Sequence, residues 1–217
     1  MFTVNKCLCP DCNDSALSTI DFENDAIKDF PGYCINHSPN VQETTENIIK
    51  YVQTHEKIIG LNANGITFEN MNFSNKKFYG CSFQHCTFLN IQAPGARFRV
   101  SFFDFSVFSD CNLQSSNVQF SSFAGSTFSH VIFTGSDLVH ANFCGISAYQ
   151  SSFDDADLYN SRFIDSTLNF VSFRNCNLKN ANFMKTTRTD VSFKLSNTRS
   201  AVFSPEDKAF EKADGEV

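Results

Sequence analysis

The sequence has no tryptophan, only 5 prolines and 3 methionines in 217 residues, and no run of 18 apolar residues. The missing apolar run excludes a predicted transmembrane helix, and the first residues lack the apolar stretch and cleavage site of a secretion signal. A Gly-rich phosphate loop and a nucleophile elbow are also missing. We therefore expect a cytoplasmic chain with no membrane partner and no phosphate-transfer or serine-hydrolase chemistry.

Residue types that usually carry catalysis are scattered along the chain. Of the 5 histidines, His55, His85, His130 and His140 are far apart in the sequence. The only carboxylate cluster lies at residues 154–157, and we interpret it as a solvated face, with a cation or acidic recognition patch as the alternative. The chain is therefore predicted not to be an enzyme.

Phenylalanine is abundant, with 26 residues, and it recurs with a fixed period. Stepping by five from Phe68 to Phe203 gives 28 positions, of which 18 are Phe, five are Leu and one is Val. The residue two places earlier is small or aliphatic in all but one case, Lys76. Residues i−2 and i of an extended segment point to the same side, so both positions should face inward.

A period of five fits neither an amphipathic helix nor an alternating strand. It fits a short extended side followed by a corner, with four such sides closing one coil. The sequence therefore predicts an all-β solenoid of about seven coils, roughly 34 Å long at a strand spacing of ~4.8 Å. Phenylalanines one coil apart, from Phe83 to Phe203, should stack as an unbroken ladder.

Individual units of the repeat resemble a known motif. Ser136-Asp137-Leu138, Ala141-Asn142-Phe143 and Ala181-Asn182-Phe183 are similar to the A(D/N)LXX motif of the pentapeptide repeat proteins. The resemblance covers residues 66–203 and implies a right-handed quadrilateral β-helix in a bacterial protein. Some members of that family bind type II topoisomerases by resembling DNA. Members dimerise through the C-terminal coil, where this chain carries Arg188, so monomer and dimer both stay open.

Eight of the nine cysteines fall into two groups. Cysteines at the small inward position of the repeat are expected to act as compact apolar residues: Cys81, Cys86, Cys111 and Cys176. A second group lies near the N-terminus and has the residue types of a tetrahedral zinc site: Cys7, Cys9, Cys12, Cys34 and His37. A three-Cys, one-His set leaves no vacant position, so the zinc would be structural.

Two alternatives stay open for this N-terminal group. Either Cys7 or Cys9 can pair with Cys12 as a metal ligand. Alternatively, all of these cysteines could be free thiols in a flexible arm. The spacing also resembles a C-x4-C…C-x2-H zinc knuckle found at the front of some pentapeptide repeat proteins. That resemblance implies Cys7, Cys12, Cys34 and His37 as ligands, although the loop between Cys12 and Cys34 is longer than usual.

Four segments follow from these patterns. Residues 1–37 form the zinc-knuckle-like segment, 38–65 a capping helix and the approach to the coil, 66–203 the β-helix, and 204–217 a C-terminal cap and tail. The helix is predicted to begin at Ser38-Pro39, to include Val52 and Ile59, and to cover the first coil. A second Ser-Pro pair at Ser204 predicts a short C-terminal helix, with Phe210 plugging the last coil.

The distribution of charged residues along the chain favours some functions of a β-helix over others. The net charge is −6, but residues 61–203 hold 11 basic and 9 acidic residues. A DNA mimic needs negative potential along the rod, and a slightly basic coil does not supply it. Direct nucleic-acid binding is not favoured either, since residues 1–60 hold 4 basic and 9 acidic residues.

Large apolar residues also occur where solvent is expected. Val100 and Phe120 are one coil apart and should share one corner, with two further phenylalanines and two arginines nearby. The predicted contact surface contains Arg97, Arg99, Val100, Phe102, Phe105 and Phe120. The alternative is that the irregular stretch Ala93-Pro94-Gly95, or the N-terminal segment folded back, covers it. The predicted function is a non-catalytic protein–protein interaction module; the alternative is a DNA gyrase-binding, quinolone-protecting DNA mimic.

Overall fold

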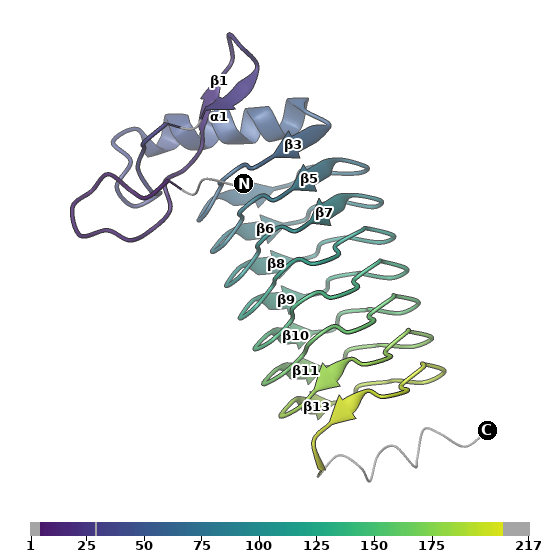
Figure 1. Ribbon diagram of the computed structural model, residues 1–217. Helices are drawn as coiled ribbons and strands as arrows, with labels where there is room; N and C mark the ends of the chain where they lie inside the picture. Colours follow the sequence, from purple (N-terminus) through teal and green to yellow (C-terminus); the bar gives the residue numbers. More distant parts are fainter. Residues whose placement is uncertain (1–4, 29, 206–217) are drawn as a thin grey trace.

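The protein is a rod of stacked coils with a small N-terminal segment at one end (Figure 1). The computed structural model describes residues 5–28 and 30–205. The N-terminal segment contains a hairpin of β1 (Thr19–Asp21) and β2 (Ala26–Lys28) and the helix α1 (Val41–Thr54). Within the described part of the chain, no helix is long and apolar enough to span a bilayer.

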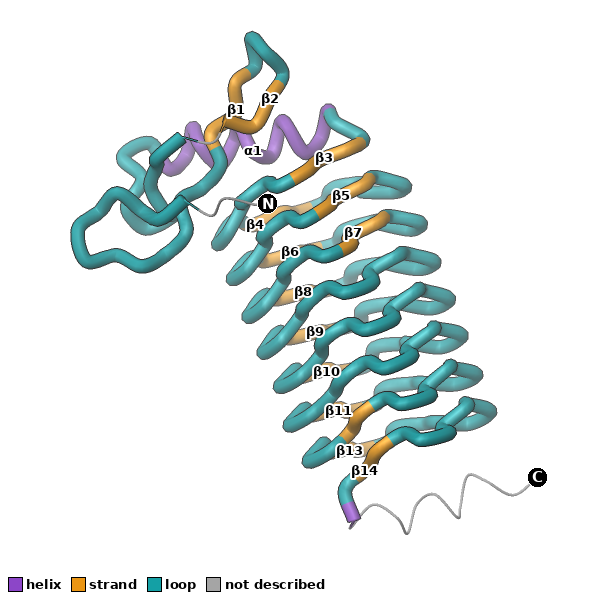
Figure 2. Tube along the Cα trace, in the orientation of Figure 1, coloured by secondary structure: helices purple, strands orange, loops and turns teal. Residues whose placement is uncertain are grey.

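The coils are built from very short parallel strands that recur at the same place in successive coils (Figure 2). The first group is β3 (Lys57–Ile59), β5 (Lys77–Tyr79) and β7 (Arg97–Arg99). A seven-stranded sheet on another side contains β4 (Thr67–Glu69), β6 (Thr87–Leu89), β8 (Val107–Ser109), β9 (Thr127–Ser129), β10 (Ser147–Tyr149), β11 (Thr167–Asn169) and β13 (Thr187–Thr189). The last pair is β12 (Asn182–Phe183) with β14 (Val202–Phe203).

Isolated bridges continue these ladders along the other sides, each joining one coil to the next, as between Asn112 and Ile132. The prediction of an all-β solenoid of about seven turns is therefore confirmed. Its right-handedness stays a prediction. Pairing between coils begins at Lys57, ahead of the predicted boundary at residue 66.

A left-handed corner explains the period of five. Every fifth residue from Gly60 to Ser200 has a positive φ, between 46° and 79°. After three extended residues this conformation turns the chain by one corner and restarts the pattern. Glycine and asparagine adopt it at little cost and supply many of the corners, as at Gly125 and Asn160.

Only one side of the coil forms a wide regular sheet, and its outward side chains explain why. In five of its seven strands the first residue, which faces outward, is threonine, with Val107 and Ser147 in the other two. β-branched side chains favour the extended, pleated backbone. The sides joined only by isolated bridges carry residues such as Asn112 and Asn142 there, which favour turns over strands.

The core is an aromatic column running the length of the rod. Successive rings of the predicted ladder lie 4.8–5.2 Å apart between centroids, with interplanar angles of 3–12°. Its seven members are Phe83, Phe103, Phe123, Phe143, Phe163, Phe183 and Phe203. The unbroken stack predicted from the sequence is therefore confirmed.

The small inward position does more than leave room for the rings. The Ser126 hydroxyl donates to the Phe103 carbonyl at 2.7 Å and accepts from the Ser106 amide at 3.1 Å, which joins two coils inside the core. Cysteine can replace serine there, since the Cys86 thiol lies 3.0 Å from the Ala63 carbonyl. Burial raises the pKa of Cys86 to about 12, so this thiol stays neutral and apolar as expected.

Helix α1 covers the first coil, and Ile48, Tyr51 and Val52 are buried in the same core as the rings. The predicted start at Ser38-Pro39 is wrong, because Asn40 is the N-cap and the helix begins at Val41. The Ser38 amide instead donates to the Cys34 carbonyl at 3.0 Å, in a preceding turn. Ile59, also assigned to the helix, lies in β3.

At the opposite end, the inward residues of the last coil are less buried than those of the coils before it. The Arg188 guanidinium, at an inward position, lies 5.5 Å from the Phe193 ring centroid and 5.1 Å from that of Phe203. A cation over two ring faces is favourable and shields apolar surface at the end of the stack. The predicted C-terminal helix and Phe210 lie outside the described residues.

Candidate functional site

Four side chains of the N-terminal segment converge as a candidate metal centre. The donor atoms of Cys7, Cys12, Cys34 and His37 all lie within 4.8 Å of one another. His37 Nδ1 is 3.2 Å from Cys34 Sγ and 3.6 Å from Cys7 Sγ. The Cys12 and Cys34 sulfur atoms are 3.9 Å apart. Two turns bring these residues together, one after Cys7 and one from Cys34 to Ser38.

These separations fit a four-coordinate metal. At a zinc–sulfur distance of ~2.3 Å, the ligand atoms of a regular tetrahedron are roughly 3.8 Å apart. Cys9 is not among the four; its backbone amide donates to Cys7 Sγ at 3.4 Å, so Cys9 contacts the cluster through its main chain. Of the two pairings left open by the sequence, the structure brings together the one with Cys7.

The protonation of the thiols is uneven. Burial acts to raise the pKa of Cys7, but hydrogen bonds from the amides of Cys34 and Cys9 outweigh it and lower the pKa to about 7. The pKa of Cys12 is raised to about 11, where the hydrogen bond from the Asp14 amide is outweighed by burial and by the neighbouring thiols. Crowded thiols resist joint ionisation unless a cation sits between them.

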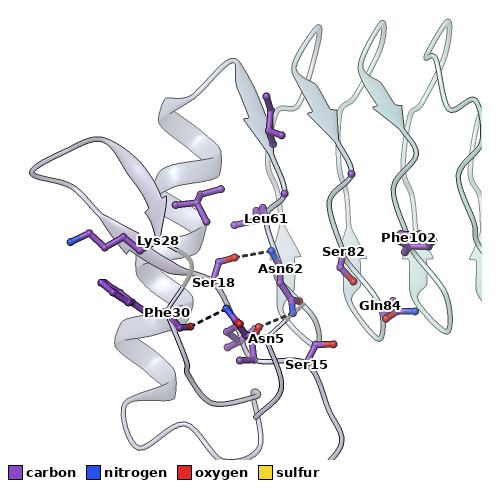
Figure 3. Close-up of a pocket in the computed structure, with 16 residues that line it drawn as sticks. Asn5, Ser15, Ser18, Lys28, Phe30, Leu61, Asn62, Ser82, Gln84 and Phe102 are labelled. Atoms are coloured by element: carbon purple, nitrogen blue, oxygen red, sulfur yellow. Dashed lines mark hydrogen bonds between the residues drawn. The ribbon is translucent and has the colours of Figure 1, made fainter. Parts of the chain in front are cut away.

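Hydrogen bonds attach the N-terminal segment to the first coil. Asn62 donates through its backbone amide to the Ser18 hydroxyl at 2.8 Å and through its side chain to the Ala16 carbonyl at 2.7 Å (Figure 3). Beside this junction is a pocket of about 570 Å³. Phe30 lies at its N-terminal side and Phe102 at its coil side.

The predicted contact surface is exposed. Val100, Phe102, Phe105 and Phe120 expose between 45% and 59% of their surface. Three of them occupy the left-handed corner position, with φ of 55° at Val100, 58° at Phe105 and 59° at Phe120. Arg97 and Arg99 are exposed in β7, directly before Val100.

Two of these rings are partly supported by neighbouring coils. Phe105 stacks on His85 at 5.3 Å and lies against Gly125, where a Cβ atom would come within 2.7 Å of the ring. Phe120 stacks on His140 at 5.0 Å. Phe102 lines the pocket beside the N-terminal segment and is still 45% exposed, and the other three residues are exposed to a similar or greater extent. The alternative of a covered surface therefore does not hold for the described residues.

The carboxylate cluster does not converge on one site. Asp154 accepts from the Arg174 amide at 2.8 Å, Asp155 from the Asn175 side chain at 2.7 Å, and Asp157 from the Asn177 side chain at 2.9 Å. Each carboxylate therefore bonds to its own neighbour in the next coil, as expected for a solvated face.

Sequence reasoning missed two kinds of surface residue that simple counting would have found. Phe170 and Leu195 are apolar corner residues, 50% and 79% exposed, at the same fifth position as Val100. Lys57 and Lys77 lie two coils and one coil before Arg97 and align with it in register, β3 with β5 and β5 with β7. Stepping through outward positions one coil at a time reveals such columns.

Comparison with known proteins identifies the repeat in the C-terminal part of the rod. A family model described as "Pentapeptide repeat region" matches residues 126–203. No match is found among curated proteins.

Several solved structures are similar at low identity. One is HetL, a pentapeptide repeat protein involved in heterocyst differentiation regulation in the cyanobacterium Nostoc sp. strain PCC 7120, with 14% identity and a TM-score of 0.41 over 73% of this chain and 93% of that one. Another is QnrB1, a plasmid-mediated fluoroquinolone resistance protein, with 14% identity and a TM-score of 0.38 over 74% of this chain and 99% of that one. Residues 126–203 of this chain thus match a pentapeptide repeat region, and the same ladders run back to Lys57.

Proposed function

We propose that this protein is a non-catalytic interaction module. In it, the whole solenoid is a pentapeptide repeat domain, the N-terminal segment is held by a structural zinc ion, and a partner protein binds around Val100, Phe102, Phe105 and Phe120. The observation that carries the proposal is the backbone conformation at Val100, Phe105 and Phe120.

A left-handed conformation is unfavourable for a β-branched or bulky residue. In the same column of corners the chain carries glycine at Gly80 and asparagine at Asn160, which adopt this conformation more readily. Val100 accepts the backbone cost and also places an apolar side chain in solvent. Since neither feature favours folding, recognition of a partner explains them better than stability does.

Zinc suits the donor set of Cys7, Cys12, Cys34 and His37, because three thiolates and one imidazole at tetrahedral separations are typical of structural zinc sites. The expected role is to fold a segment with little core of its own and so to keep it on the first coil. Metal analysis of the purified chain should give about one zinc per molecule. Cys34→Ser should abolish binding, and Cys9→Ser, the control, should retain it. A stoichiometry near zero contradicts the zinc proposal.

The contact surface is tested by affinity capture from the native cell. The test variant carries Val100→Asn, Phe105→Asn and Phe120→Asn. Phe170→Asn is a matched control. Phe170 has a φ of 55° and is as exposed as Phe120, but it belongs to a different column of corners. The triple variant should lose a partner that the control retains, with both variants folded by circular dichroism. Equal recovery of that partner by both variants refutes the surface.

Binding to DNA gyrase as a DNA mimic is the second candidate, and the surface charges disfavour it. In the column that contains Lys57, Lys77 and Arg97, the only acidic residues are Asp137 and Asp157. Two carboxylates beside three cations do not reproduce the continuous negative potential of a duplex. A DNA gyrase supercoiling assay tests this directly. Inhibition of supercoiling, or protection of the enzyme from quinolones, would favour the DNA-mimic function.

A further inference from the structure

The side of the rod that begins with β3, β5 and β7 carries its charge in two opposite blocks. Its outward residues align one per coil through strand pairing and isolated bridges. In order along the rod they are Lys57, Lys77, Arg97, Asn117, Asp137, Asp157, Asn177 and Asn197. The column thus has three cations at one end, asparagine in the middle and two carboxylates beyond it.

The charged groups of this column have no opposite charge of their own. Among residues 5–28 and 30–205, the ion pairs within 4 Å involve other side chains, so Lys57, Lys77 and Arg97 are left without a carboxylate. The acidic members bond to amides: Asp137 accepts from the Gln119 side chain at 2.5 Å and Asp157 from that of Asn177 at 2.9 Å. Both blocks therefore keep their net charge.

We propose that this side is the interface of an antiparallel dimer, in which a second copy of the chain packs face to face. A two-fold axis through the coil of Asn117 exchanges the two blocks. Arg97 lies one coil before Asn117 and Asp137 one coil after it, so each faces the other across the interface. Lys77 and Asp157, two coils before and after, are exchanged in the same way, which makes the surface self-complementary.

The neighbouring columns are compatible with this arrangement. Tyr79 and Tyr159 are equally distant from Gln119, so the rotation brings these two rings opposite each other. Phe120, half exposed at the adjoining corner, is brought opposite its own copy. A parallel packing would instead place Lys77 against Lys77 and Asp157 against Asp157, and like charges directly opposite are unfavourable. Charge therefore selects the antiparallel arrangement.

The dimer should be weak and sensitive to salt. Six strand spacings separate Lys57 from Asn177, which gives a strip about 29 Å long and one side of the coil wide. A strip of this length, and only one side of the coil wide, covers less surface than the roughly 1,200–2,000 Å² that a standard protein–protein interface buries. Much of the attraction is then between partly exposed charges, and these are screened within ~3 Å at 1 M salt.

The inference goes beyond the proposed function, because it requires no other protein. The test is sedimentation velocity of the full-length protein over a concentration series at low and at high salt. One double variant, Lys77→Glu with Arg97→Glu, reverses the charge of the basic block. The other, Asp137→Lys with Asp157→Lys, makes the column wholly positive. Asp165→Lys, an exposed charge change at a corner that does not border this side, is the control.

The wild type and the control should dimerise at low salt and dissociate at high salt. Each double variant alone should associate at least about ten-fold more weakly, since four attractive pairs become repulsive. An equimolar mixture of the two should recover a heterodimer, which a merely structural effect of the substitutions could not produce. A wild type that stays monomeric at low salt, or a mixture that does not associate, overturns the proposal.

Discussion

Phe143 lies at the centre of the aromatic column and offers the sharpest test of what holds the rod together. Its ring stacks on Phe123 at 5.1 Å and on Phe163 at 4.9 Å, and three further rings meet it edge-on at 5.5–6.2 Å. The side chain is fully buried. Phe143→Ala should lower the free energy of unfolding by about 4–5 kcal/mol, from lost burial, the cavity and the ring contacts.

Phe203, the last ring of the same column, is the matched comparison. Among the described residues it stacks on Phe183 alone, meets Phe193 edge-on and is partly exposed. Phe203→Ala should cost about 1–2 kcal/mol by the same reasoning. Urea unfolding followed by circular dichroism measures both, with Phe143→Leu as an intermediate case because leucine fills the equivalent position at Leu138. Equal losses at the centre and the end would refute the column as the source of stability.

The other predictions concern single groups. Ser126→Ala should destabilise the fold by about 0.5–1.5 kcal/mol, because the Phe103 carbonyl of the preceding coil loses the shorter of its two hydrogen bonds and keeps only the one from the Ser106 amide at 3.3 Å. Ser161→Ala should cost nothing, since that buried hydroxyl has no partner among the described residues, and urea unfolding compares the two variants. Val100→Asn should raise stability by about 0.5–1 kcal/mol in the same assay, and a loss instead would mean that the corner is not strained. Hydrogen bonds from Asn24 and from Lys28 on the opposite strand hold the pKa of Asp21 well below its usual value. The hairpin is therefore stabilised above about pH 4 and weakened as pH falls further; Asp21→Asn should remove this dependence in amide NMR spectra, and an unchanged pH profile would contradict it.

The structure of the regular part of the rod could be predicted because each position of the five-residue repeat has one structural role. At Phe143 the inward large position must be filled, and at Ser126 the small position must leave room, so a count by five finds both. The ladder of rings needed only a count from one coil to the next. At each of these positions the local sequence pattern and the tertiary packing favour the same type of residue, so the fold can be predicted from the sequence.

The irregular ends were less predictable, for physical reasons. Ser38-Pro39 has the composition of a helix start, but the turn at Cys34 takes the Ser38 amide, and the helix begins later. The choice between Cys7 and Cys9 depends on which sulfur the turns direct inward, and spacing does not determine that. The position of the Arg188 guanidinium over two end rings was not predicted, because it depends on three-dimensional packing and not on the repeat pattern.

The two ends of the rod are closed by unequal means. Helix α1 buries Ile48 and Val52 completely at the first coil, whereas within the described residues the last coil has the Arg188 guanidinium over Phe193 and Phe203. In a solenoid each coil contacts only its neighbours, so opening should propagate inward from the weaker end. Amide hydrogen exchange should therefore form a gradient along the chain, fastest near Phe203 and slowing coil by coil toward α1.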